Sequence, residues 1–286
     1  STDHNPRLSI ISPYWGGVNA VVEAMRNVAS VGATPHAVSD CLCFGNPEKP
    51  HQMWEFVEAV RGVSDACNAI TLKETPECST PIIAGNVSFY NESKSGAIPP
   101  SPIVSCLGRI KNVEKTITMS LKNVGSVILM IGSRKDELGG SLFYGLNSEL
   151  GANVPAPNLE EVKRQIFAVT DCIDQGLLYA CHDISDGGIA VAMSEMTFDN
   201  NIGCSVKIPG GLPLEKLLFT ETGGFVIEAN NKNLEQVETI LTSYDLDYSN
   251  LGTTNNKPQI SINDTIEISV EEAKTIWSHG LRDKIK

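Results

Sequence analysis

A short run of polar residues follows an apolar stretch within residues 81–93, and its residue types suit a nucleotide or metal site. Gly85 is expected to permit a tight turn or a close backbone approach to a ligand. Asn86 and Ser88 are two residues apart, so their side chains point the same way if the chain stays extended. An amide oxygen and a hydroxyl can hold a hard cation or a phosphate oxygen. The alternative is a strand that leads into a polar turn without a ligand.

Two further polar segments follow predicted strands. In residues 39–47, Asp40 can bind a ribose hydroxyl or an adenine amino group, complete a metal shell, or remain a solvated or capping residue. In residues 182–188, a histidine and two aspartates could perform acid/base or metal chemistry. We favour a structural role there, with Asp186 or Ser185 as the N-cap of the following helix.

Composition narrows the class of protein. The 286 residues carry a formal net charge of −12 without a basic cluster, which argues against nucleic acid and acidic membranes as partners. No apolar run approaches the roughly 18 residues of a membrane span, and the polar residues 1–7 predict no secretory signal. The eight cysteines form no C-x-x-C pair, so buried, reduced thiols in a cytoplasmic protein are expected. Cys41 and Cys43 alternate along a predicted strand, which is poor zinc geometry.

Hydrophobic periodicity predicts the elements that position these residues. Strands are expected near residues 8–11, 36–43, 81–88, 103–110, 124–131, 177–181, 204–208, 225–229 and 260–262. Helices are expected near residues 18–28, 53–67, 142–146, 158–169, 189–196, 234–241 and 270–276. Asn158 and Glu161 form a capping-box pattern. Trp15, Trp54 and Trp277 are expected to pack into apolar surfaces.

The order of these elements predicts an α/β fold with mixed (α+β) sheets. Residues 111–122 are more polar than their surroundings and lack a clear strand. We therefore expect an N-terminal α/β module at residues 1–115, which carries the nucleotide- and metal-contacting loops, and a C-terminal α/β module at residues 116–286.

Several motifs together resemble the C-terminal half of phosphoribosylformylglycinamidine synthase, also called formylglycinamide ribonucleotide amidotransferase. They lie in residues 12–17, 24–28, 39–50, 84–92 and 182–188, in that family's order and spacing. The resemblance implies two α/β modules like those of aminoimidazole ribonucleotide synthetase.

The resemblance also implies an activity and roles for individual residues. Family members use ATP and Mg²⁺ to activate the amide oxygen of a ribonucleotide substrate by phosphorylation. Ammonia from glutamine then displaces phosphate to give the amidine, a step of de novo purine biosynthesis. By position, Asp40 and Gly85 would contact ATP, Asn86 would bind Mg²⁺, and Ser88 would bind the substrate. The implied partners are the N-terminal half of the enzyme, a glutaminase subunit, a small accessory subunit and, as a further option, a second copy in a homodimer.

Two departures from the family pattern shape this prediction. Cys43 stands where the family usually has asparagine. The family's catalytic histidines, its phosphate-contacting lysine and its acidic magnesium ligands belong to a preceding half, so no catalytic residue is assigned here and the chain alone is expected to be inactive. The alternatives are a non-catalytic nucleotide-binding or scaffold half, or another member of the same ATP-binding superfamily, such as a selenophosphate or thiamine-phosphate enzyme.

Overall fold

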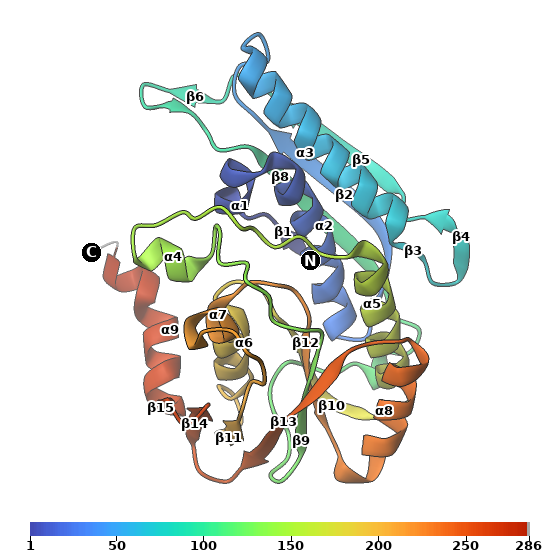
Figure 1. Ribbon diagram of the computed structural model, residues 1–286. Coiled ribbons are helices and arrows are strands. Elements are labelled where there is room, and N and C mark those ends of the chain that lie inside the picture. Colours follow the sequence, from blue (N-terminus) through green and yellow to red (C-terminus); the bar gives the residue numbers. More distant parts are fainter. Residues whose placement is uncertain (285–286) are drawn as a thin grey trace.

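The chain folds around two larger β-sheets in the computed structural model, which describes residues 1–284 and the side chains of residues 1–280 (Figure 1). The first sheet has four strands in the order β1 (Thr2–Asp3), β8 (Ser101–Arg109), β2 (Thr34–Cys43) and β5 (Ile82–Ser88). Strand β2 runs parallel to β5 and antiparallel to β8. Two short hairpins project from this region: β3 (Thr71–Leu72) with β4 (Thr75–Ser79), and β6 (Glu92–Ser93) with β7 (Gly96–Ala97).

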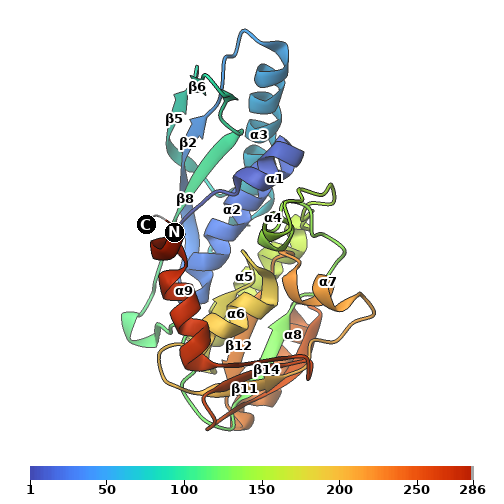
Figure 2. The ribbon, with the colours of Figure 1, turned by 90° about the vertical axis from the view of Figure 1, so that its left-hand side faces the viewer.

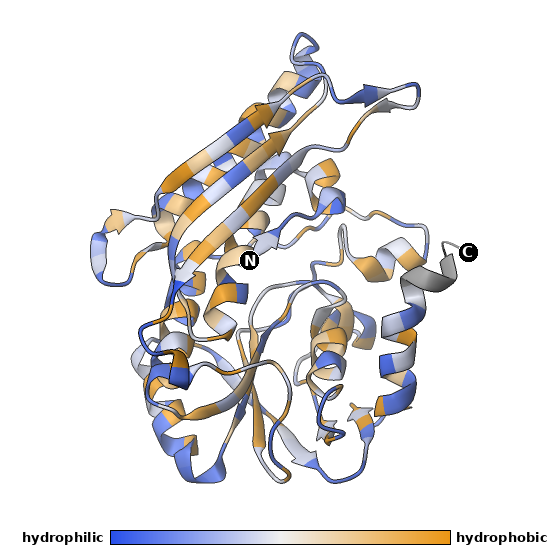
Figure 3. Cartoon of the chain, turned by 180° about the vertical axis from the view of Figure 1, so that it is seen from behind, coloured by the Kyte–Doolittle hydropathy of each residue, from blue (hydrophilic) through white to orange (hydrophobic). Residues whose placement is uncertain are grey.

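Helices α2 (Pro13–Ser30) and α3 (Pro50–Ala69) cover one face of the first sheet. Helix α2 is almost entirely buried, because it packs on the sheet, on α3 and on the second half of the chain. Its contact with α3 is close: a Cβ at Gly17 would meet the carbonyl oxygen of Ala59 at 2.3 Å. Among residues 1–284, no helix covers the opposite face of the sheet, which is open in the view from behind (Figure 3).

The second sheet has seven strands and helices on both faces. Its order is β10 (Leu178–Asp183), β12 (Phe225–Ala229), β9 (Val127–Ile131), β13 (Tyr248–Asn255), β11 (Gly203–Val206), β14 (Gln259–Ile262) and β15 (Ile266–Ser269). The remaining helices are α1 (Pro6–Ile11), α4 (Leu142–Leu146), α5 (Leu159–Asp174), α6 (Gly188–Met196), α7 (Leu214–Phe219), α8 (Leu234–Ser243) and α9 (Val270–Lys284), with 3₁₀ turns at Val113–Lys115 and Asn231–Asn233. Figure 2 shows α9 and α6 side by side.

Strand β9 divides the core because both of its faces are buried. Val127, Leu129 and Ile131 join a large cluster with α2, α5 and α8, so this cluster extends from the first sheet to the second. Ile128 and Met130 point to the other face and pack with α6 and β11. An uninterrupted apolar run is the pattern expected of a strand covered on both sides.

Three local predictions were wrong. Residues 8–11 form the end of helix α1 and no strand, because Asn5 caps the backbone N–H groups of Arg7 and Leu8 and Pro6 opens the helix. The side chains of Trp54 and Trp277 are 51% and 57% exposed. Trp15, in contrast, packs against the large core.

The predicted cap of α5 is confirmed. Asn158 caps α5 by accepting hydrogen bonds from the N–H groups of Glu160 and Glu161. All eight cysteines are free thiols, and five of them are buried. Among residues 1–284, none of the helices combines the length and the apolar character that crossing a membrane requires.

Candidate functional site

The four predicted site residues lie on two neighbouring parallel strands. Asp40 on β2 stands opposite Gly85 on β5, and the next pairs along are Cys41 with Asn86 and Cys43 with Ser88. All four residues lie within the strands predicted at residues 36–43 and 81–88, so the expectation that loops carry the nucleotide and metal contacts was wrong. The chain turns later, at Tyr90, whose φ of 59° is positive, and Gly85 has ordinary extended backbone.

The sheet separates these residues into two pairs, because successive side chains of a strand point to opposite faces. Asp40 shares its face with the buried Val38 and Leu42, which pack against the helices. Asn86 lies on the open face, where its amide nitrogen is 3.9 Å from Cys41 Sγ. Ser88 points the same way as Asn86, as the spacing predicted.

Asp40 reaches toward the free edge of the sheet over Gly85. A Cβ at residue 85 would lie 2.7 Å from Asp40 Oδ1, so only glycine leaves this space to the carboxylate. Burial raises the pKa of Asp40, and the backbone N–H of Asn86 partly offsets this effect. Because β5 is the outermost strand, the carboxylate lies beside an edge that a ligand can approach.

Asn86 and Ser88 present oxygen atoms on the open face. Asn86 is exposed, and no described residue donates a hydrogen bond to its amide oxygen. Ser88 is held by Asn91, which also donates to the carbonyl oxygen of Phe44. One amide oxygen suits a hard cation but does not complete a magnesium shell. Within residues 1–284 there is no group of three or more His, Cys, Asp or Glu side chains that could hold a metal, so further ligands would have to come from ATP, water or another polypeptide segment.

The segment 182–188 serves mainly structural contacts. His182 Nε2 lies 3.0 Å from Glu195 Oε2, and its Nδ1 lies 3.3 Å from Asp183 Oδ1. Burial alone lowers the pKa of His182, but the hydrogen bonds to the two carboxylates outweigh it and raise the value to about 10. The predicted N-cap was wrong: Gly187 takes this position with a φ of 77°, and no side chain of the segment caps α6.

Glu221 caps helix α6, although it lies 34 residues after Gly187 in the chain. The sequence patterns did not predict this cap. Its Oε1 accepts the N–H groups of Gly187 at 2.9 Å and Leu142 at 2.8 Å, which joins the starts of α6 and α4. Burial raises the pKa of Glu221 to about 7, although both hydrogen bonds act in the opposite direction. No local pattern marks a cap that lies 34 residues along the chain.

A buried acidic cluster was missed as well. Asp3 from β1 and Glu23 from α2 share a hydrogen bond, and Arg26 lies 3.9 Å from Glu23. Burial raises the pKa of Asp3 to about 6, whereas the hydrogen bond with Glu23 lowers it. Asp183 from β10 is 2% exposed, and its Oδ2 has no partner among the described residues. The cluster joins the two halves of the chain, which no local sequence signal could reveal.

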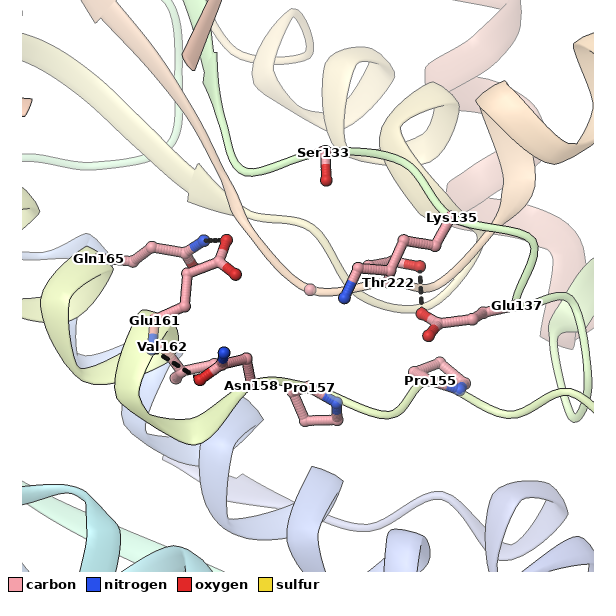
Figure 4. A pocket seen from close by; sticks show the side chains of 11 residues that line it. Ser133, Lys135, Glu137, Pro155, Pro157, Asn158, Glu161, Val162, Gln165 and Thr222 are labelled. Atoms are coloured by element: carbon pink, nitrogen blue, oxygen red, sulfur yellow. Dashed lines mark hydrogen bonds between the residues drawn. The ribbon is translucent and has the colours of Figure 1, made fainter. Parts of the chain in front are cut away.

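A narrow polar slot lies between the turn after β9, the start of α5 and residues 222–223 (Figure 4). Its volume is about 20 Å³, close to the minimum for one water molecule and far below that of a nucleotide. Four of its polar side chains are also paired, Gln165 with Glu161 at 3.0 Å and Thr222 with Glu137 at 2.6 Å. The slot is therefore no candidate for the nucleotide site.

Comparison with known proteins identifies the family to which this chain belongs. A model described as "AIR synthase related protein, N-terminal domain" matches residues 1–110, and the corresponding C-terminal domain model matches residues 123–265. The subunit PurL of phosphoribosylformylglycinamidine synthase from Methanothrix thermoacetophila is 44% identical over 292 aligned residues, covering 100% of this chain and 38% of that protein. PurL of Alkaliphilus metalliredigens is 36% identical, covering 99% of this chain and 38% of that protein. The chain thus spans well under half the length of these curated relatives.

Solved structures share the fold. PurL of Thermotoga maritima complexed with FGAR aligns with a TM-score of 0.77 at 17% identity, covering 95% of this chain and 45% of that one. The hydrogenase maturation protein HypE of E. coli aligns with a TM-score of 0.69 at 18% identity, covering 94% of this chain and 84% of that one. At sequence identities this low, the structural alignments are evidence for the fold alone. The alignments confirm the predicted mixed α/β class. Both halves of the chain match the family's two domain models in order, and the chain belongs to the AIR synthase related protein family.

Proposed function

We propose that this chain is the C-terminal half of the synthetase subunit of a phosphoribosylformylglycinamidine synthase. The 44% identity to a PurL subunit over the whole chain supports this proposal. The PurL structures of Thermotoga maritima with the same fold are complexed with FGAR and with ATP, ligands that suit the oxygen-rich surface of β2 and β5. The reaction joins ammonia derived from glutamine to formylglycinamide ribonucleotide at the expense of ATP.

Strands β2 and β5 contribute different residues to the proposed binding site. Asp40 and the backbone of Gly85 bind ATP at the edge of the sheet, Asn86 contributes an oxygen ligand to Mg²⁺, and the Ser88 hydroxyl binds the ribonucleotide. Asn86 would help to hold the Mg²⁺, and the ion would supply positive charge to the transferring phosphoryl group. The amide oxygen of the substrate attacks the γ-phosphate and ADP leaves. Ammonia then adds to the activated carbon, and phosphate leaves to give the amidine. The residues of this chain hold and orient the reactants.

The open sheet face is the observation that carries this proposal. Asn86 and Ser88 lie on this face, and Figure 3 shows hydrophobic segments along the strands of the same sheet. Leu107 on β8 is 60% exposed, and we expect a partner to cover it. We propose that the N-terminal half of the enzyme covers this face and supplies the catalytic groups and the acidic magnesium ligands. The glutaminase subunit and the small accessory subunit complete the assembly. The free thiols suit a reducing compartment, and we place the enzyme in the cytoplasm.

Calorimetric titration tests the composite site. The chain is titrated with ATP and Mg²⁺ alone and after mixing with the remaining part of a PurL subunit. Binding only in the mixture is the expected result, since the described residues do not complete a magnesium shell and the proposal places further ligands on the other segment. Binding by the isolated chain would reveal a complete nucleotide pocket here, and absence of binding in both samples would overturn the proposed function.

A scaffold half without a role in turnover is the competing function, because the open face would equally serve assembly alone. Substitution of Asn86 distinguishes the two. A scaffold tolerates the loss of one exposed amide, whereas a magnesium ligand does not. Size-exclusion chromatography separates the remaining option, in which a second copy of this chain covers the open face.

A further inference from the structure

Two thiols lie in contact on the open face of β2. Cys41 Sγ and Cys43 Sγ are 3.6 Å apart, and both residues are partly exposed. The register places each beside a residue of the proposed site: Cys41 stands opposite Asn86, and Cys43 stands opposite Ser88. The two sulfur atoms therefore lie on the same surface as Asn86 and Ser88, and Cys41 Sγ is 3.9 Å from the amide nitrogen of Asn86.

The other cysteines differ from this pair. Cys67, Cys106, Cys172, Cys181 and Cys204 are buried. Cys78 on β4 is exposed, and no described thiol lies within hydrogen-bonding distance of it. Within the described part of the chain, only Cys41 and Cys43 combine access to solvent with a second thiol close enough to react.

We propose that Cys41 and Cys43 form a reversibly oxidised dithiol whose disulfide form disables the Asn86–Ser88 surface. The oxidant is a small disulfide such as oxidised glutathione. One thiolate attacks it, forms a mixed disulfide and releases the first reduced glutathione. The second thiolate attacks the protein sulfur of that bond and releases the second. Two thiol protons and two electrons pass to glutathione, so the reaction balances. The consequence for ligand binding rests on the proposed function, but the sulfur chemistry does not.

Strand geometry makes this disulfide both disruptive and easy to reduce. Residues i and i+2 of an extended strand lie roughly 6.6 Å apart at Cα. This is near the upper limit of about 6.8 Å for a disulfide and above the commonest separation of about 5.5–6 Å, so we expect the bond to draw Cys41 and Cys43 together and to bend β2 at Leu42. Since β2 is hydrogen-bonded to β5 and β8, the bend disturbs the pairing that aligns Asn86 and Ser88. Strained disulfides are also reduced readily, which makes the change reversible.

Mass spectrometry tests the chemistry directly. The full chain is exposed to oxidised glutathione, its remaining thiols are alkylated, and its peptides are mapped. We expect an internal Cys41–Cys43 bridge that dithiothreitol removes. Cys41→Ser and Cys43→Ser should each carry a glutathione adduct on the remaining thiol, with Cys43→Ala as a second variant at that position. Cys78→Ser is the matched control and should bridge like the parent. A parent chain that accumulates only mixed disulfides, or one whose internal bridge joins a different pair of cysteines, would overturn the proposal.

A second measurement tests the consequence. ATP–Mg²⁺ affinity is compared between the reduced and the bridged chain, each mixed with the remaining part of a PurL subunit. We expect affinity at least about tenfold weaker after bridging, restored by dithiothreitol. Equal affinity of both forms overturns the disabling effect. If the proposed function itself is wrong, the result differs, because the mixture that contains the reduced chain then also binds no nucleotide.

Discussion

The carboxylate of Asp40 occupies the space that a side chain at residue 85 would need. A Cβ built on Gly85 would lie 2.7 Å from Asp40 Oδ1 and 3.1 Å from its Cγ. The carboxylate is the mobile end of a side chain, so it can move aside without disturbing the backbone. The glycine at this position therefore protects the placement of Asp40.

Gly85→Ala should consequently weaken nucleotide binding with little change in stability. We expect its unfolding free energy to change by less than about 1 kcal/mol, since only a side-chain end moves. The ATP–Mg²⁺ affinity of the assembled enzyme should fall about tenfold, as measured by calorimetry. Asp40→Ala is expected to show a similar loss, and the double variant should lose no more than either single one. Additive losses would mean that Gly85 acts independently of Asp40.

Asn86→Ala tests the proposed metal ligand. In the complete enzyme we expect turnover to fall more than about tenfold, because removing a group that stabilises transition-state charge typically costs several kcal/mol. Asn86→Asp keeps an oxygen at the same place and should recover part of the activity at raised Mg²⁺ concentration. Near-normal steady-state rates in Asn86→Ala would favour the scaffold function.

Lys73 connects the β3–β4 hairpin to α5 through hydrogen bonds. Its Nζ donates to Phe167 O at 2.9 Å, Thr170 Oγ1 at 2.8 Å and Asp171 Oδ1 at 2.7 Å. Its side chain is only 15% exposed, so this is more than a surface ion pair. Lys73→Met should lower the free energy of unfolding by about 1–3 kcal/mol in urea titrations.

Lys94 provides the matched control for this lysine. It is exposed in the β6–β7 turn and makes no hydrogen bond or ion pair with any described residue. Lys94→Met should leave the urea midpoint unchanged. An equal effect of the two substitutions would show that the Lys73 contacts do not stabilise the fold.

Glu221 should make stability depend on pH. Burial raises the pKa of this carboxyl to about 7 in the folded chain, above its ordinary value of 4.5. The folded state therefore holds the proton more tightly than the unfolded state, and stability falls as pH rises from about 4.5 to about 7. The total effect is at most about 3 kcal/mol, at 1.36 kcal/mol for each pKa unit.

Glu221→Gln should flatten that part of the stability curve, because an amide neither gains nor loses the proton. Its Oε1 can still accept the N–H groups of Gly187 and Leu142. Urea unfolding at several pH values measures the slope, and Glu215→Gln on the exposed side of α7 serves as the control. A Glu221→Gln slope identical to that of the parent would assign the pH dependence to other groups, such as Asp3.

Local sequence determined most of the elements of this protein. The apolar run at Val127–Ile131 specifies a doubly buried strand, and Asn158 specifies where α5 begins. The alternation of residues 41–43 and 86–88 placed Cys41 beside Cys43 on one face, and Asn86 and Ser88 on one face. These features depend on neighbours within a few positions, which the sequence displays directly. Residues 8–11 also follow local sequence, because the Asn5 cap and Pro6 start a helix there in spite of the two β-branched isoleucines.

Tertiary structure decided how the parts of the candidate site are combined. Only strand pairing sets Asp40 against Gly85, and only the sheet places Asp40 and Asn86 on opposite faces. The cap from Glu221 to Gly187, the contact of Lys73 with Asp171, and the cluster of Asp3 with Glu23 all join distant positions. Their partners are selected by packing across the whole chain, and no local pattern records that selection. Strand periodicity alone determined which way Asn86 and Ser88 point, whereas the fold determined that this face is left open.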